Sequence, residues 1–139
     1  MNIKGIAHVC IQSSDLVATE TFFERVFGLS KIFEFHRQGT VVGFYLEVVP
    51  RQFIEVFRSD SIDADPTKHV ITHFCLESSD IEADHRTLAD AGADPGKLTV
   101  GADGTRQFWV TGPDHLRIEF QEYTDASLQF RGGACELSW

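Results

Sequence analysis

Apolar and polar residues follow one another along this chain in an order that occurs twice. Residues 6–12 alternate as a β-strand does, and residues 16–27 then carry apolar side chains at helical spacing. Asp15 is placed to cap the start of that helix, and Gly28 is placed to end it in the left-handed conformation. Three strand-like runs follow, at 31–37, 41–49 and 52–58. The first half therefore predicts a strand, a helix and three strands.

The second half of the chain repeats this order. A strand is predicted at 71–77. The following helix is predicted to begin with a capping box of Ser79 and Glu82 and to end at Gly92. Three further strand-like runs lie near 97–100, 106–111 and 116–122. The second half thus predicts the same series of elements.

Two short motifs support a duplication. Residues 8–15 read HVCIQSSD and residues 73–80 read HFCLESSD, an offset of 65 residues. Later in each half, QFIEVF around Glu55 corresponds to LRIEFQ around Glu119, an offset of 64 residues. Two motifs at nearly one offset indicate a repeated structural module. We place the modules at 1–60 and 70–123, a polar linker that contains Pro66 at 61–69, and a C-terminal tail of unassigned role at 124–139.

The composition narrows the possible partners. The chain has 139 residues, 42% of them hydrophobic, which is enough for a core without disulfide bonds. Twelve basic against 21 acidic residues give a formal charge of -9, which repels polyanions, so we expect neither nucleic acid nor a membrane as partner. Three cysteines (Cys10, Cys75 and Cys135) without CxxC spacing predict no disulfide framework or zinc knuckle. Without a signal-type or membrane-spanning apolar run, we expect a cytoplasmic protein.

Each module also carries one histidine and one glutamate out of phase with the apolar residues of their strands. These are His8 and Glu55 in the first module, and His73 and Glu119 in the second. If the sheets curl around a shared cavity, all four line it. Buried carboxylates are costly unless they are paired or bound to a metal, and a mixed nitrogen and oxygen set suits Ni, Zn, Co, Mn or Fe. The pattern predicts one divalent metal ion held by these residues, with two octahedral positions open to water or substrate.

The chain resembles the vicinal-oxygen-chelate superfamily over about residues 3–123. The resemblance is carried by the strand led by His8, the Asp15-Leu16 helix start, the helix end at 22–29, His73, and Gly112-Pro113-Asp114 before Glu119. The superfamily includes glyoxalase I, extradiol dioxygenases, methylmalonyl-CoA epimerase, and fosfomycin and bleomycin resistance proteins. The resemblance implies an α+β fold of two paired βαβββ modules that form a curved-sheet cavity. It also implies that the four residues named above match the four metal-ligand positions.

The ligand set is similar to that of the bacterial type of glyoxalase I. This implies a lyase or isomerase that acts on a small oxygenated molecule through a metal-bound enediolate, with Glu119 or Glu55 as the catalytic base and Glu119 favoured. In the glyoxalase case the substrate would be a glutathione hemithioacetal. The resemblance further implies a homodimer, and the cavity could be built within one chain or between two.

Two alternatives stay open, a dioxygenase and a non-enzymatic binding module. An Fe(II) extradiol dioxygenase would use His8, His73 and Glu119 alone, and Glu55 argues against it because a fourth ligand blocks a position that substrate and oxygen need. Methylmalonyl-CoA epimerases usually have Gln in place of Glu55. A non-enzymatic drug-binding module would usually lack the ligand set.

Several neighbouring residues allow two interpretations. Arg117 either binds an anionic substrate or pairs with a carboxylate. Cys10 and Cys75 are interpreted as small cavity-filling residues rather than outer ligands. Phe53, Phe57 and Trp109 either pack in the core or form an apolar wall against substrate. The family's Pro-Asp-Gly turn is Pro113-Asp114-His115 here, and we expect it to persist because histidine tolerates the left-handed region.

Overall fold

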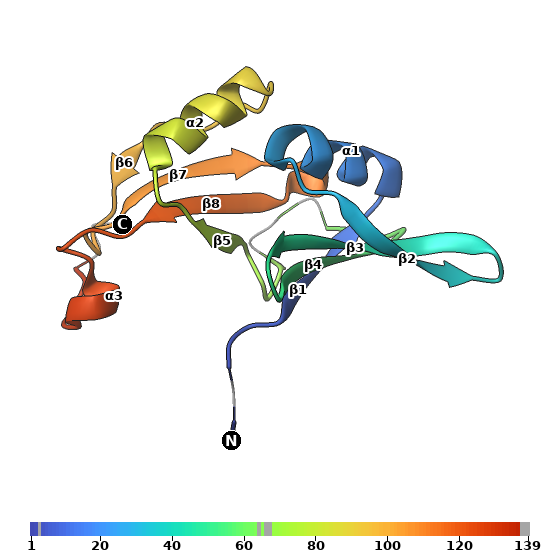
Figure 1. Cartoon of the computed structure of the whole chain (residues 1–139), viewed down its shortest axis with the longest axis horizontal. Coiled ribbons are helices and arrows are strands. Elements are labelled where there is room, and N and C mark those ends of the chain that lie inside the picture. Colours follow the sequence, from blue (N-terminus) through green and yellow to red (C-terminus); the bar gives the residue numbers. More distant parts are fainter. Residues whose placement is uncertain (3, 64, 66–67, 137–139) are drawn as a thin grey trace. The chain divides into compact units, whose positions relative to one another are not determined.

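The computed structural model describes residues 1–2, 4–63, 65 and 68–136, and the chain divides into two compact units (Figure 1). The first unit comprises Met1–His69 with Gly112–His115, and the second comprises Val70–Thr111 with Leu116–Trp139. Each unit contains one four-stranded sheet. Pro66 of the predicted linker lies outside the described residues. Among the helices that the structure describes, none is long and apolar enough to cross a membrane.

The first unit contains the predicted strand, helix and three strands. They are β1 (His8–Ser13), α1 (Leu16–Phe27), β2 (Lys31–Arg37), β3 (Thr40–Val49) and β4 (Gln52–Arg58). The sheet order is β1-β4-β3-β2, with β1 parallel to β4 and the other pairs antiparallel. The central position of β4, the last strand in sequence, brings the two motif strands of the module side by side.

Local sequence fixes both ends of α1. The Asp15 carboxylate accepts hydrogen bonds from the backbone N–H groups of Val17 and Ala18, each at 3.0 Å. Gly28 ends the helix at φ 66°, in the left-handed region that glycine adopts without steric strain. Both predictions are confirmed. Phe23 of α1 is completely buried in a core that also contains Phe44, Leu46, Ile54 and Val56.

The second unit repeats the arrangement. It contains β5 (Phe74–Glu77), α2 (Ile81–Asp90), β6 (Thr99–Val100), β7 (Arg106–Thr111) and β8 (Arg117–Glu122), and the sheet order is β5-β8-β7-β6. Its core includes Ile81, Leu88, Phe108, Val110 and Ile118. A short helix, α3 (Leu128–Arg131), lies in the segment predicted as a tail. The predicted α+β fold of two βαβββ modules is confirmed.

Two predicted details of the second module are wrong. The strand β5 begins at Phe74, so His73 directly precedes it instead of lying within it. The α2 N-cap is Asp80, whose carboxylate accepts from the Ala83 N–H at 3.0 Å, and the Ser79–Glu82 capping box does not form. The Glu82 carboxylate pairs instead with Arg106 of β7 at 2.5 Å. Asp80 caps the helix because it directly precedes Ile81, the first helical residue, and its carboxylate therefore reaches the free N–H of Ala83.

The turn before β8, called η2 (Pro113–His115), groups with the first unit. Asp114 at φ 54° and His115 at φ 60° both lie in the left-handed region, so the turn persists with histidine as expected. The Asp114 carboxylate accepts from the backbone N–H of Ser14 at 2.9 Å and also from the Ser14 hydroxyl. This contact attaches the turn to the start of α1.

Candidate metal-binding site

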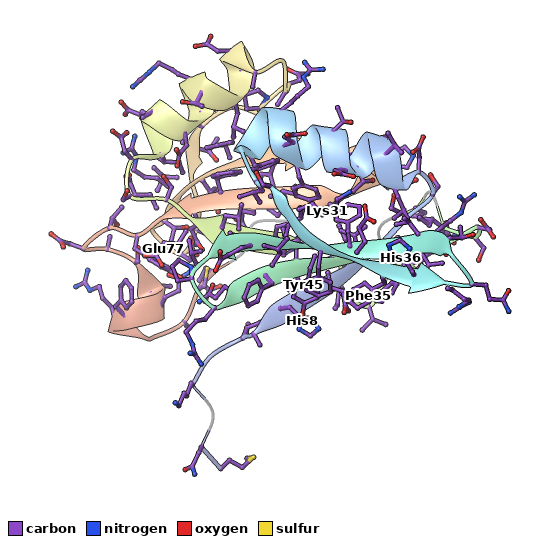
Figure 2. All side chains as sticks on the ribbon, turned by 45° about the vertical axis from the view of Figure 1, so that its right-hand side comes forward. His8, Lys31, Phe35, His36, Tyr45 and Glu77 are labelled. Atoms are coloured by element: carbon purple, nitrogen blue, oxygen red, sulfur yellow. The ribbon has the colours of Figure 1, made fainter. Side chains whose placement is uncertain are left out.

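His8 and Glu55 lie on the face of the first sheet that points away from α1. Parallel pairing of β1 with β4 places Cys10 opposite Glu55, and the neighbouring residue Ile54 is buried on the α1 side. The His8 Nε2 atom is 3.8 Å from the Glu55 Oε2 atom. The His8 side chain is 43% exposed and that of Glu55 18% exposed. Figure 2 shows His8 on the same side of this sheet as Tyr45. The structure therefore brings the first predicted pair together.

Aromatic rings surround the first pair. We call the set Phe33, Phe35, Tyr45, Phe53 and Phe57 the aromatic face. Phe33 stacks on Tyr45 with ring centroids 4.8 Å apart, and Phe35 stacks on Phe57 at 4.7 Å. Tyr45 also meets the His8 imidazole edge-on at 5.8 Å. Phe53 and Phe57 thus line the open face and not the core. Phe33 and Phe35 were not singled out from the sequence, although their i, i+2 spacing along β2 indicates that they share one face of the sheet.

His73 and Glu119 form the matching pair in the second unit. Their Nε2 and Oε2 atoms are 3.4 Å apart, and the side chains are 37% and 13% exposed. Glu119 lies opposite Cys75 on β5 and opposite Trp109 on β7. The Trp109 ring meets the His73 imidazole edge-on at 4.9 Å. The structure therefore also brings the second predicted pair together.

Arg117 stacks on an aromatic ring. Its guanidinium carbon lies 4.3 Å from the centre of the Trp109 ring, a cation–π contact that neither sequence interpretation anticipated. The remaining neighbours of Glu119 on this face are polar. We call the set Cys75, Glu77, Gln107 and Gln121 the polar face, which follows from the pairing of β5, β7 and β8.

Burial and charge change the titration of three groups at these pairs. Burial raises the pKa of Glu119, and the nearby His73 acts in the opposite direction. Burial and the Glu55 carboxylate raise the pKa of the Cys10 thiol to about 11. Burial and the Glu119 carboxylate raise that of Cys75 to about 12. Both thiols are therefore protonated at neutral pH, which favours their interpretation as small side chains over that as thiolate ligands.

The donor sets fit a divalent cation. Two donors bound to one ion at about 2.1 Å and right or tetrahedral angles lie roughly 3.0–3.4 Å apart. The pair of His73 and Glu119, at 3.4 Å, is within that range, and the pair of His8 and Glu55, at 3.8 Å, lies beyond it by 0.4 Å. Among the described residues, no group of three or more His, Cys, Asp or Glu side chains is arranged to hold a metal ion. Each unit supplies two donors, and their union in one four-residue site stays a prediction.

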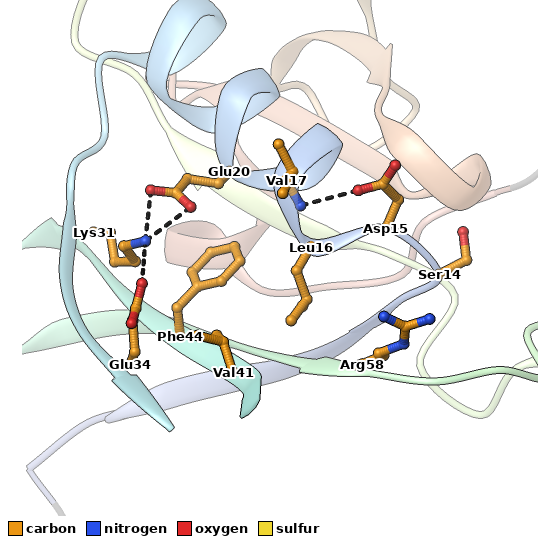
Figure 3. A pocket seen from close by; sticks show the side chains of 10 residues that line it. All are labelled: Ser14, Asp15, Leu16, Val17, Glu20, Lys31, Glu34, Val41, Phe44 and Arg58. Atoms are coloured by element: carbon orange, nitrogen blue, oxygen red, sulfur yellow. Dashed lines mark hydrogen bonds and ion pairs between the residues drawn. The ribbon is translucent and has the colours of Figure 1, made fainter. Parts of the chain in front are cut away.

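A hollow of about 520 Å³ lies on the opposite side of the first sheet, beneath α1 (Figure 3). The Lys31 ammonium in its wall donates to Glu20 at 2.9 Å and to Glu34 at 2.6 Å. Phe44 and Val41 provide apolar lining. The Lys31 ammonium thus bridges the two carboxylates and joins α1 to β2. The hollow contains neither His8 nor Glu55.

Comparison with known proteins identifies relatives over most of the chain. The model of the Glyoxalase/Bleomycin resistance protein/Dioxygenase superfamily matches residues 5–120. The uncharacterized protein YwbC of Bacillus subtilis (strain 168) is 30% identical over 122 residues, which cover 84% of this chain and 96% of that protein. A glyoxalase family protein from Enterococcus faecalis has a similar crystal structure, with a TM-score of 0.76 and 28% identity over 88% of this chain and all of that one.

Two more distant structures share the fold. A lactoylglutathione lyase from Agrobacterium tumefaciens has a TM-score of 0.67 at 19% identity, covering 88% of this chain and 96% of its own. TnmS3, an antibiotic binding protein from Streptomyces sp. CB03234, has a TM-score of 0.68 at 16% identity, covering 89% and 99%. One fold thus serves both an enzyme and a binding protein, so side chains must decide between them.

Proposed function

The chain belongs to the Glyoxalase/Bleomycin resistance protein/Dioxygenase superfamily, and we propose that within it the protein is a metal-dependent lyase or isomerase of the glyoxalase I type. The superfamily includes enzymes of this kind. The observation that carries the proposal is the repeated His–Glu pair, with donor atoms 3.8 Å and 3.4 Å apart in the two units. Glu55 supports this proposal over an extradiol dioxygenase, which would use only His8, His73 and Glu119 as ligands.

The proposed site comprises His8, Glu55, His73 and Glu119, which would hold one divalent cation. A bound cation of this kind acts as a Lewis acid and stabilises oxyanion charge that develops on a substrate with two adjacent oxygens. The histidines would donate neutral ring nitrogens and the glutamates carboxylate oxygens. This mixed set accepts Ni, Zn, Co, Mn or Fe.

Glu119 is the favoured base for moving a proton between neighbouring substrate carbons. Its carboxylate is the more buried of the two, at 13% exposure against 18% for Glu55. Burial raises its pKa, which brings its basicity nearer to that suited for proton transfer at neutral pH. Glu55 would act as the second carboxylate.

A binding function is the second candidate, and one feature favours it. The aromatic face offers stacked rings suited to a flat apolar molecule, and TnmS3 is an antibiotic binding protein. The His–Glu pairs favour the enzyme, because a module that only sequesters a drug does not need two additional pairs of metal donors. A dioxygenase is the third candidate, and its requirement for iron would distinguish it from the lyase or isomerase.

The test measures metal content and turnover together. Protein purified without chelator is analysed for transition metals as wild type and as His73→Ala, Glu119→Ala and His36→Ala. His36 serves as the matched control because it pairs with Glu34 at 3.0 Å outside the proposed ligand set. Turnover is measured with a hemithioacetal of an α-ketoaldehyde and with a panel of catechols.

The proposal expects near-stoichiometric Ni, Zn or Co in wild type and in His36→Ala, loss of most metal in the other two variants, and isomerisation of the hemithioacetal only where metal is bound. Stoichiometric metal in either ligand variant would remove that residue from the site. Iron with catechol cleavage would favour the dioxygenase, and a reproducible absence of metal would favour the binding module.

A further inference from the structure

The C-terminal segment 123–131 is docked onto the second sheet through buried polar groups. Ser127 is fully buried, and its hydroxyl accepts from the Thr124 N–H at 2.8 Å. The Thr124 hydroxyl donates to the Gly104 carbonyl at 2.7 Å, and the Leu128 N–H donates to the Asp103 carbonyl at 2.8 Å. The segment therefore attaches to the loop between β6 and β7.

Two glycines in that loop permit the close approach. At Gly104, with φ +81°, a Cβ atom would lie 2.6 Å from the Ala126 carbonyl oxygen. At Gly101, a Cβ atom would lie 2.6 Å from the Asp103 carboxylate. Both distances are well below van der Waals contact, so a side chain at either position would push the segment or the carboxylate away. The loop sequence is thus suited to this docking.

Asp103 is the residue at which loop, segment and sheet meet. Its Oδ1 atom accepts from the Thr105 N–H at 3.2 Å and from the Thr105 hydroxyl at 2.7 Å. Its Oδ2 atom accepts from Gln129 of α3 at 2.6 Å and from Gln121 of β8 at 3.3 Å. Burial raises the pKa of Asp103, the hydrogen bonds from Thr105 and Gln129 lower it, and the net shift is downward. The group is accordingly a carboxylate, which only accepts hydrogen bonds.

This carboxylate fixes the orientation of the Gln121 amide. Because Asp103 only accepts, the Gln121 NH₂ group must point toward it and the Gln121 carbonyl must point the other way. That carbonyl oxygen lies 3.7 Å from the Cys75 sulfur, on the polar face two residues from Glu119. The Cys75 thiol is a weak hydrogen-bond donor, and the Gln121 carbonyl oxygen has two lone pairs. This oxygen can therefore accept a further hydrogen bond from a ligand.

We propose that Gln121 is a specificity-determining residue, oriented by Asp103 and Gln129 so that its carbonyl accepts a hydrogen bond from a hydroxyl, amide N–H or ammonium group of the substrate. The proposal rests on the function proposed above, whose substrate it narrows to molecules with a donor group beside the reacting carbons. Asp103 and Gln129 are positioning residues. The C-terminal segment then supports the binding site through Gln129.

The orientation is tested by NMR of the side-chain amide groups in the full-length protein purified without chelator. We expect the Gln121 amide protons to resonate away from free glutamine and to exchange slowly with water. In Asp103→Asn and Gln129→Ala they should move toward the free values, whereas Arg131→Ala, a change in the same short helix, should leave them in place. A free-glutamine signal in the wild type would overturn the proposal.

Recognition is tested with two sulfides that cannot be turned over, phenacyl 2-hydroxyethyl sulfide and phenacyl propyl sulfide. They differ only in a terminal hydroxyl against a methyl group. A single hydrogen bond predicts that wild type binds the hydroxyethyl compound about 2- to 10-fold more tightly. Gln121→Leu should abolish this preference, and Asp103→Asn should reduce it. Gln12→Leu, a glutamine on the first sheet, should retain it.

These readouts do not depend on turnover, so failure of the proposed activity leaves them interpretable. Equal affinity for the two sulfides in wild type, no binding of either, or a preference that survives Gln121→Leu would each overturn the proposal. An unaltered preference in Asp103→Asn, with the Gln121 amide signal displaced, would remove the positioning role of Asp103.

Discussion

The two sheets carry the same His–Glu pair on two different surfaces. In the first sheet, Glu55 has Tyr45 as its neighbour on β3, and Phe53 and Phe57 flank it on the same face of its own strand. In the second sheet, Trp109 on β7 is the corresponding neighbour of Glu119, and Arg117 and Gln121 flank Glu119 on β8. Donor atoms, strand register and one aromatic neighbour, Tyr45 or Trp109, are thus common to both modules. The rings of Phe53 and Phe57 in the first sheet are replaced in the second by the hydrogen-bonding groups of Arg117 and Gln121. If the proposed function holds, the His–Glu pair of each module supplies metal donors, and the two different surfaces contact different parts of a substrate.

The largest expected effect tests whether the two pairs are equivalent. His8→Ala and His73→Ala should each lower metal affinity by more than about 100-fold, because loss of a direct donor exceeds the 10- to 100-fold cost of losing an outer partner. Metal titration by calorimetry measures this. If His8→Ala retained wild-type affinity, the first pair would be only an ion pair and the comparison between the modules would fail.

Refolding the same two variants together sharpens that result. We propose that the protein is a homodimer. If each metal site takes one His–Glu pair from each chain, a dimer of the two variants has one intact site of two. Random mixing makes half of the dimers of this kind, so about a quarter of wild-type metal binding should be restored. No recovery is expected if each site lies within one chain. Metal content of the mixed dimer, isolated with two different affinity tags, distinguishes the two arrangements.

The role of Glu55 in chemistry is the next largest effect. Glu55→Gln retains shape and an oxygen donor but removes charge and basicity. For the proposed isomerase we expect proton transfer to fall by about 10²- to 10⁴-fold at matched metal loading, as is typical for loss of a general acid–base group. Hemithioacetal turnover measures it. Catechol cleavage that persists in the variant, without isomerase activity in either protein, would contradict the proposal.

A smaller effect concerns packing at equivalent positions of the two sheets. At Gly43 of β3 a Cβ atom would lie 2.3 Å from the Val56 carbonyl oxygen and 2.7 Å from the Phe57 ring. Gly43→Ala should therefore lower the free energy of unfolding by about 1–3 kcal/mol. Gln107→Ala at the matching position of β7 should change it by less than about 0.5 kcal/mol. Urea unfolding measures both, and equal effects would show that the first sheet relaxes around the added methyl group.

The smallest expected effect compares the two helix caps. Asp15 accepts from two backbone N–H groups and Asp80 from one, that of Ala83. Asp15→Ala should cost about 1 kcal/mol of stability and Asp80→Ala somewhat less. Thermal unfolding of both variants beside Asp60→Ala, an exposed aspartate outside the helices, checks the order. A larger loss for Asp80→Ala would contradict it.

The sequence predicted the elements that have strong periodicity. The bounds of β2, β4 and β7 match the expected ranges, because turn-forming residues flank these runs: Gly39 follows β2, Pro50 precedes β4, and Gly112 follows β7. The start of β5 was wrong because Val70 and Ile71 extend the apolar pattern, although both are exposed and lie outside the strand. The capping box was wrong because Asp80 competes with Ser79 for the same backbone groups. Propensity alone does not decide such local competition.

The His–Glu pairs could be predicted because the duplication displays them twice. Strand parity likewise predicted that Cys75 and Gln121 share the face of Glu119. The hydrogen bonds that orient Gln121 could not be predicted, because Asp103, Gln121 and Gln129 share no periodicity and are brought together only by the docked C-terminal segment. The stacking of Arg117 on Trp109 depends on cross-strand register, which the sequence of either strand alone does not give. The union of the two pairs around one ion stays a prediction.

The turn at Gly112–His115 has a consequence for how the chain folds. It groups with the first unit although its sequence lies between two strands of the second, and its contact with Ser14 spans 100 residues. During synthesis the first unit is therefore incomplete until residue 115 has left the ribosome, because the Asp114 carboxylate that receives the Ser14 N–H is made late. Contacts of such long sequence separation slow folding. A fragment that ends at residue 69 should consequently fray at the start of α1, with faster amide hydrogen exchange there than in β3 and β4.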